Sequence, residues 1–184
     1  NDIRTEFFNV LDWLRERACA RQHGLGTKIP WDNDWLVESL ADSVIYMAFY
    51  ILAKFVNTKE ILAENMSDEF FDYIFYGNSE GESTRDSDMI AKRMNITIEK
   101  LEEIRNEFLY FYPVDSRHSG RDLVPNHLTF FVLNHVVLFP KENWPKEIVV
   151  NGSVLIDGKK MSKSMGNIIP LRDAVRKYGA DPIR

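Results

Sequence analysis

The chain has 184 residues, 45% of them apolar, and is therefore long enough to bury a hydrophobic core. Its 28 acidic and 23 basic residues give a formal charge of −5, which argues against a surface devoted to nucleic-acid phosphates. The single cysteine, Cys19, excludes an internal disulfide framework and a CxxC zinc site.

Apolar stretches are interrupted before they reach the roughly 18 residues of a membrane span, and the N-terminus lacks a signal-peptide pattern. We therefore expect a cytoplasmic protein without membrane contacts. The chain begins at Asn1 without a methionine and stops at Arg184 within a predicted helix. These ends suggest a piece of a longer protein.

The N-terminal third alternates helical and extended patterns. Apolar residues at helical spacing predict a helix over residues 7–17. Residues 26–30 are expected to be short and extended, because a proline restricts the residue before it, and the sequence WDNDW at 31–35 indicates a turn-rich link. Residues 43–56 are apolar nearly all round, which predicts a helix buried on several sides.

Residues 57–107 differ in composition from the rest and are interpreted as a helical insertion. They combine short amphipathic, charged runs with an acidic Gly/Ser linker at 77–88. The predicted helices of this region cover residues 59–65, 68–77, 90–94 and 97–112.

Strand patterns return in the last third. A short strand is expected to end at residues 119–120, before an apolar helix over 122–139. The β-rich runs EIVV and SVLI flank Asn-Gly at 151–152, which predicts a hairpin with a type I′ turn. A second turn is expected at 157–158 and a helix at 171–179. Strands alternating with buried helices predict an α/β fold.

The stretch DGKKMSKSMGN, residues 157–167, is a candidate phosphate-binding loop. A mobile ammonium from Lys160 or Lys163 could neutralise charge on a polyphosphate as it reacts, and Ser162 and Ser164 could donate hydrogen bonds to the same oxygens. On composition alone, a solvated surface turn is the simpler interpretation. No GxxxxGK[ST] sequence occurs, so a Walker-type loop is not expected.

The stretch SGRDLVPNH is a second candidate. Gly120 is expected to end a strand, Asp122 to begin the next helix and His127 to follow five residues later. These groups would lie at the carboxyl edge of a sheet, where nucleotides bind in open α/β folds and a carboxylate can accept both ribose hydroxyls. Alternatively, Asp122 is a helix cap and His127 a structural histidine. Asn134 shares a helix face with His127, whereas His135 lies off that face and is expected to be structural.

Together and in this order, these segments resemble class I aminoacyl-tRNA synthetases. Residues 160–164 read KMSKS, the signature of that class, and ARQHGLGTKIPW at 20–31 resembles the return to the catalytic domain after the editing insertion. Residues 42–50 and 110–139 are similar to leucyl-tRNA synthetases of the archaeal and eukaryotic-cytosolic type. YGADPIR, residues 178–184, resembles the start of the helical segment that follows the signature.

The resemblance implies the second half of a Rossmann-like catalytic domain over residues 1–170, with the helical insertion at 57–107, and the start of a further helical segment at 171–184. It implies that leucine and ATP, with Mg²⁺, give leucyl-adenylate, and that the leucyl group passes to tRNA(Leu). No structural metal is implied in this segment.

The resemblance also assigns roles to single residues. Lys163 and Lys160 would be the catalytic groups, with Lys163 acting on the transition state. The residues implied in ATP binding are Lys160, Ser162, Lys163, Ser164, Gly120 and Asp122. Those implied in the leucine or adenylate pocket are His127, Tyr46 and Ser43.

The chain departs from the family pattern in several places. It contains no HIGH motif, and the editing and anticodon-binding domains are missing, so the segment alone is expected to be inactive. Arg121 and His118 stand where the family more often has Lys and an apolar residue. Two alternatives stay open. One is another nucleotidyltransferase or ligase with a similar lysine loop, which would need its own HxGH-type segment; the other is a noncatalytic helical binding module centred on 57–107.

Overall fold

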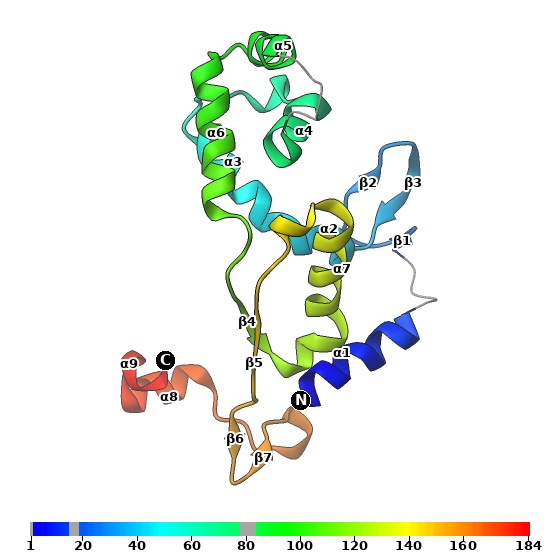
Figure 1. Cartoon of the computed structure of the whole chain (residues 1–184). Coiled ribbons are helices and arrows are strands. Elements are labelled where there is room, and N and C mark those ends of the chain that lie inside the picture. The colour runs from blue at the N-terminus through cyan, green and yellow to red at the C-terminus, as the bar shows by residue number, and fades with distance from the viewer. Residues whose placement is uncertain (1, 15–18, 78–83) are drawn as a thin grey trace. The chain divides into compact units, whose positions relative to one another are not determined.

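The structure is a computed structural model and describes residues 2–14, 19–77 and 84–184. The chain divides into two compact units, Asn1–Val150 and Asn151–Arg184 (Figure 1). The first unit contains two hydrophobic clusters, and the second contains the lysine-rich loop.

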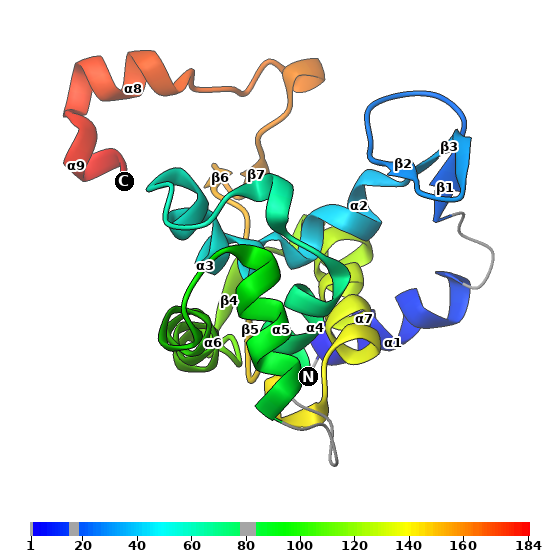
Figure 2. The same cartoon turned by 90° about the horizontal axis from the view of Figure 1, so that it is seen from above.

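The larger cluster is helical. The helices α3 (Tyr46–Asn57), α4 (Asp68–Tyr76) and α5 (Thr84–Met94) each pack against α6 (Ile98–Phe111), as Figure 2 shows from above. The fully buried side chains of this cluster include Leu52, Phe55, Phe70, Ile74, Leu101, Ile104 and Phe108.

Local capping explains where two of these helices begin. The Ser67 hydroxyl accepts a hydrogen bond from Phe70 N at 3.4 Å, and the Thr97 hydroxyl accepts one from Lys100 N at 3.2 Å. The α4 helix ends at Gly77, whose φ of 82° is left-handed. The helices predicted over 68–77 and 97–112 are therefore confirmed.

Two predictions within the insertion are wrong. Residues 59–65 form no α-helix, because Lys59 has a left-handed φ of 61° and only the short 3₁₀ turn η3 (Ala63–Asn65) follows. The α5 helix begins at Thr84, inside the segment predicted as a linker and before the predicted start at residue 90. The rest of that linker, residues 78–83, lies outside the described part of the chain.

The smaller cluster brings distant segments together. The helix α1 (Asp2–Trp13), the turns α2 (Ser39–Asp42) and η2 (Ser43–Ile45), and α7 (Thr129–Leu138) pack against one another. Val44, Phe130 and Phe131 are buried at their centre. The predicted first helix is correct in type but begins five residues earlier than predicted; residues 15–17 of the prediction lie outside the described residues.

A small antiparallel sheet with strand order β1-β3-β2 lies between α1 and α2 in the sequence. Its strands are β1 (Ala20–Arg21), β2 (Lys28–Ile29) and β3 (Asp32–Val37). The turn-rich link predicted over residues 31–35 is wrong, since all but the first of these residues belong to β3. Leu36 pairs with both Arg21 and Lys28, and this pairing outweighs the low strand propensity of the Asp and Asn residues.

A βαβ unit positions the expected nucleotide edge. The strand β4 (Arg117–Gly120) lies beside β5 (Ile148–Asn151), and α7 forms the connection between them (Figure 1). Lys146 N donates to Val114 O and Arg117 N donates to Glu147 O, both at 2.9 Å, so the two segments run in the same direction. The predicted α/β class and the strand ending at residues 119–120 are confirmed.

The hairpin of the second unit lies at a different turn from the one predicted. The strand β6 (Leu155–Ile156) pairs antiparallel with β7 (Lys159–Lys160), whereas β5 pairs with β4. Asp157 and Gly158, with φ of 49° and 72°, form the two-residue turn between β6 and β7. Asn151 and Gly152 have no positive φ, which excludes a type I′ turn there.

The chain after the lysine loop forms α8 (Leu171–Tyr178) and the short α9 (Ala180–Ile183). Gly179 ends α8 with a φ of 86°, as the prediction of a helix over 171–179 requires.

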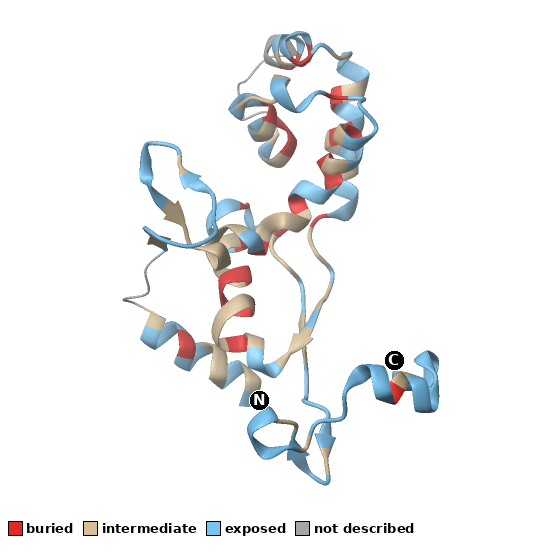
Figure 3. Ribbon diagram, turned by 180° about the vertical axis from the view of Figure 1, so that it is seen from behind, coloured by how far each residue is buried: buried red, intermediate tan, exposed pale blue. Residues whose placement is uncertain are grey.

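Residues 39–57 have the length and mean hydropathy of a membrane span, contrary to the expectation that no stretch is long enough. The segment is divided into α2, η2 and α3, and α3 contributes Ala48, Ile51, Leu52 and Phe55 to the helical cluster. Figure 3 shows buried residues along α3, α4, α6 and α7. The high hydropathy of α3 is therefore that of a core helix.

Candidate functional site

Gly120 and Asp122 lie in direct proximity at the end of β4. A Cβ atom added to Gly120 would stand 2.6 Å from the Asp122 Oδ1 atom, so the Asp122 carboxylate would have to move to admit it. The turn η4 (Arg121–Leu123) begins here without a side-chain cap, so Asp122 does not act as the helix cap. Its carboxylate thus lies against the Gly120 backbone at the carboxyl edge of the parallel pair.

Arg121, between these two residues, anchors the turn to α1. Its Nε atom donates to Glu6 Oε2 at 3.0 Å, and both side chains are partly accessible to solvent. This ion pair therefore joins η4 to α1.

His127 lies in a five-residue π turn, η5 (Val124–Leu128), in which Pro125 is the second residue. Wide turns of this kind occur frequently at functional sites. The His127 Nε2 atom is 3.0 Å from a terminal nitrogen of Arg117. Burial of the imidazole, and secondarily the positive charge of Arg117, lower the pKa of His127 below its usual value.

Two polar residues of α7, His135 and Asn134, have structural partners. The buried His135 ring donates from Nδ1 to Phe131 O at 2.7 Å and accepts from the Tyr112 hydroxyl at 3.3 Å, so the prediction of a structural histidine is confirmed. Asn134 donates to the Ala41 carbonyl and joins α7 to α2. On the helix face that it shares with His127, Asn134 therefore makes a structural contact between helices.

The remaining pocket residues lie near the same helix. Ser43 begins η2, which packs against α7 through its neighbour Val44. Tyr46 begins α3, and its ring lies edge-on to Tyr50 with 5.1 Å between the centroids. Their predicted role beside leucine stays a prediction.

The lysine loop is closed by Asn167. Its Oδ1 atom accepts from Ser162 N at 2.9 Å, and its Nδ2 atom donates to Lys160 O at 3.1 Å. The hydroxyls of Ser162 and Ser164 are 2.8 Å apart, and Gly166 ends the short η7 turn (Lys163–Met165) with a left-handed φ of 67°. The loop is thus held by its own side chains and is not an unstructured turn.

The lysines of this loop are exposed, and neither Lys160 nor Lys163 forms an ion pair within residues 2–14, 19–77 and 84–184. Both ammonium groups are therefore accessible to an anionic ligand. Sequence reasoning missed Asn167 as the group that positions them. Its signal was the Gly-Asn pair directly after the KMSKS residues.

The expected ATP residues thus fall into two groups. Gly120 and Asp122 belong to the first unit, and residues 160–164 to the second. That both groups hold one ATP molecule stays a prediction.

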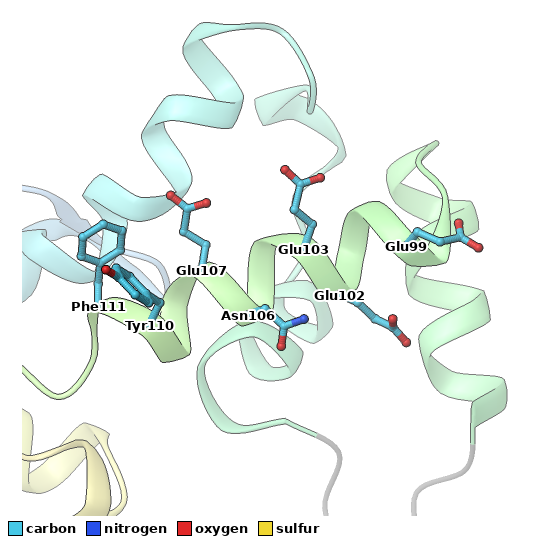
Figure 4. A pocket seen from close by; sticks show the side chains of 7 residues that line it. All are labelled: Glu99, Glu102, Glu103, Asn106, Glu107, Tyr110 and Phe111. Atoms are coloured by element: carbon cyan, nitrogen blue, oxygen red, sulfur yellow. The ribbon is translucent and has the colours of Figure 1, made fainter.

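The α6 helix carries a separate open pocket of about 630 Å³ (Figure 4). Its walls include four glutamates and the rings of Tyr110 and Phe111, and none of the expected site residues lines it. Glutamates would repel a triphosphate, so this pocket is not a candidate ATP site. Within the described part of the chain, no group of three or more His, Cys, Asp or Glu residues could hold a metal ion.

Comparison with known proteins shows similarity over the whole chain. Residues 1–184 match the family of tRNA synthetases class I (I, L, M and V). The chain is 50% identical over 183 residues to leucine–tRNA ligase of Pyrobaculum islandicum and 52% identical over 183 residues to leucine–tRNA ligase 2 of Sulfolobus acidocaldarius, with 100% of this chain covered in each case. It is 50% identical over 181 residues, 98% of the chain, to leucine–tRNA ligase of Archaeoglobus fulgidus. The chain spans 19% of the length of each of these relatives. The chain belongs to the class I tRNA synthetases.

Proposed function

We propose that the protein containing this chain is a leucine–tRNA ligase and that this segment supplies part of its ATP site. The observation that carries the proposal is the KMSKS loop, closed by Asn167 with both lysines accessible, in a chain about 50% identical throughout to leucine–tRNA ligases. The proposed substrates are leucine, ATP with Mg²⁺, and tRNA(Leu).

In the first reaction, a carboxylate oxygen of leucine attacks the α-phosphorus of ATP. A bond forms between that oxygen and phosphorus, the bond from phosphorus to the bridging oxygen breaks, and pyrophosphate leaves with Mg²⁺. Negative charge grows on the departing oxygens, where the ammonium groups of Lys163 and Lys160 stabilise the transition state. The hydroxyls of Ser162 and Ser164 donate hydrogen bonds to the same phosphates.

The first unit holds the nucleoside in this proposal. The Asp122 carboxylate accepts hydrogen bonds from the ribose hydroxyls, and Gly120 leaves space for that carboxylate and for close approach of the ligand. His127, Tyr46 and Ser43 border the leucine or adenylate pocket. A terminal ribose hydroxyl at the 3′ end of tRNA(Leu) then attacks the leucyl carbonyl carbon; an ester bond forms, the bond from that carbon to the phosphate oxygen breaks, and AMP leaves.

Other parts of the same protein complete the enzyme in this proposal. A HIGH-containing half supplies the opposite side of the ATP site, and an anticodon-binding domain contacts tRNA. Leucine differs from isoleucine and valine by too little apolar surface for binding alone to give translational accuracy, so a separate editing domain hydrolyses errors. The enzyme is proposed to act in the cytoplasm.

Amino-acid-dependent exchange of pyrophosphate into ATP by the full-length protein tests the proposal. We expect exchange with leucine and much weaker exchange with methionine. In Asp122→Asn, the KM for ATP should rise more than the KM for leucine, because the ribose contact is weakened. Exchange with another amino acid but not with leucine would overturn the assignment.

A further inference from the structure

Arg117 and His127 form a pair whose hydrogen-bond direction is fixed by chemistry. The Arg117 guanidinium lies 3.0 Å from His127 Nε2. A guanidinium has only donors and is not deprotonated in proteins, so Nε2 is the acceptor. An imidazole that accepts at Nε2 is neutral and carries its proton on Nδ1. Within the described residues, Nδ1 has no hydrogen-bond partner and is available to donate.

The charge of Arg117 is not offset by a carboxylate in the described part of the chain, and its Nε atom is buried there without a hydrogen-bond partner. The pKa of His127 is lowered first by burial and then by this charge. The elements around η5 carry these other titratable groups: Asp2, Arg4, Glu6 and Asp12 of α1, His118 of β4, Arg121 and Asp122 of η4, and His135 of α7. Of these, Glu6 and Arg121 pair with each other, and His135 is held by Phe131 and Tyr112.

We propose that Arg117 is a positioning residue that holds His127 as the neutral tautomer with its proton on Nδ1, so that His127 offers a hydrogen-bond donor to the leucine or adenylate. This inference rests on the proposed function for the identity of the ligand. In this proposal, Arg117 determines both the charge of the His127 ring and which of its nitrogens donates.

Two variants of the full-length protein separate this role from a purely structural one. Arg117→Met removes the charge and the donor, so the pKa of His127 rises toward its ordinary value. Without this donor, the neutral ring can carry its proton on Nε2 and lose the Nδ1 donor, whereas the imidazolium has an N–H on both nitrogens. The kcat of leucine-dependent exchange should therefore fall severalfold more at pH 8 than at pH 6. Arg117→Lys keeps a cation and a donor and should retain the wild-type pH profile. Arg93→Met removes an exposed arginine from α5 and should change neither the profile nor kcat.

Nuclear magnetic resonance of the ¹⁵N-histidine-labelled protein reads the tautomer without substrate, with the His127 signals assigned from a His127→Asn variant. We expect Nδ1 to be protonated in the wild type and Nε2 to gain protonation in Arg117→Met. Protonation of Nε2 in the wild type, or an equal loss of kcat at all pH values in Arg117→Met, would overturn the inference. Absence of leucine-dependent exchange in the wild type would count against the proposed function alone.

Discussion

Asn167 bonds the backbone of Lys160 across the KMSKS loop, donating from Nδ2 to the Lys160 carbonyl at 3.1 Å while its Oδ1 accepts from Ser162 N at 2.9 Å. One amide side chain thus satisfies a donor and an acceptor at the start of the loop and joins them to its end. We expect the presentation of both lysines to depend on this bridge.

We predict that Asn167→Ala lowers the kcat of leucine-dependent exchange by about tenfold. Without the two hydrogen bonds of Asn167, the loop is no longer held in one conformation before ATP binds. Asn167→Asp keeps the acceptor for Ser162 N but loses the donor and adds a negative charge near the phosphates, so it should be at least as impaired. Steady-state exchange kinetics measure both. Wild-type kcat in Asn167→Ala would show that the bridge is dispensable.

The turn between β6 and β7 gives a matched test of backbone conformation. Gly158 has a φ of 72°, whereas Gly152 has no positive φ, and a Cβ added at either position meets nothing within 4 Å. Gly158→Ala should therefore cost about 1 kcal/mol in local stability, because an L-residue is strained in the left-handed region. Gly152→Ala should change it by less than about 0.5 kcal/mol.

Hydrogen exchange of the β6 and β7 amides in the full-length protein measures this difference. Faster exchange in Gly158→Ala alone agrees with the turn at Asp157–Gly158. Equal protection in the two variants, or a larger loss in Gly152→Ala, would favour the turn at Asn151–Gly152 instead.

The contact between Gly120 and Asp122 predicts a binding defect from a single methyl group. In Gly120→Ala, the new Cβ would lie 2.6 Å from Asp122 Oδ1, so the carboxylate must move. We expect the KM for ATP to rise by about tenfold or more, as one good hydrogen bond to a charged group is lost. The KM for leucine should change less. An unaltered KM for ATP would separate this carboxylate from the nucleotide.

The buried His135 predicts a pH dependence of stability. Burial lowers its pKa in the folded state, although the hydrogen bond to Phe131 O opposes this. The unfolded state, with a pKa near 6.5, therefore binds protons first as the pH falls. Stability contributed by neutral His135 is complete above about pH 6.5 and is lost at lower pH; His127 acts in the same direction.

Thermal unfolding of wild type and His135→Gln over about pH 5 to 7.5 measures this effect. The variant should be less stable at neutral pH but should lose less stability on acidification. An equal acid-induced decrease in both proteins would show that His135 does not titrate between the folded and unfolded states.

Local chemistry explains which elements could be predicted from the sequence. The α6 helix has the Thr97 cap, and α8 has Gly179 at its end, so both were predictable. Asn-Gly and Asp-Gly are nearly equivalent turn signals, and the pairing of β5 with β4 decides between them. The β3 strand was missed for a similar reason, since its Asp and Asn residues are held extended by pairing with β1 and β2.

The residues of the candidate site also fall into those that the sequence predicted and those that it did not. The KMSKS loop and the Gly120–Asp122 pair were evident from residue order, because these residues are close in sequence. The Arg117–His127 pair and the bridge from Asn167 depend on side-chain directions that a residue pattern does not specify. The contact of Arg121 with Glu6 joins residues far apart in the chain and could not be anticipated from either segment.

The central claim is that Lys163 stabilises the transition state of leucine activation. The most direct measurement is leucine-dependent ATP–pyrophosphate exchange by full-length Lys163→Ala. Lys159→Ala is the control, because it removes one positive charge from the neighbouring strand β7. We predict that kcat falls by a factor of about 100 or more in Lys163→Ala with little change in the KM for leucine, and by less than about twofold in Lys159→Ala. Equal kcat in Lys163→Ala and wild type would contradict the claim.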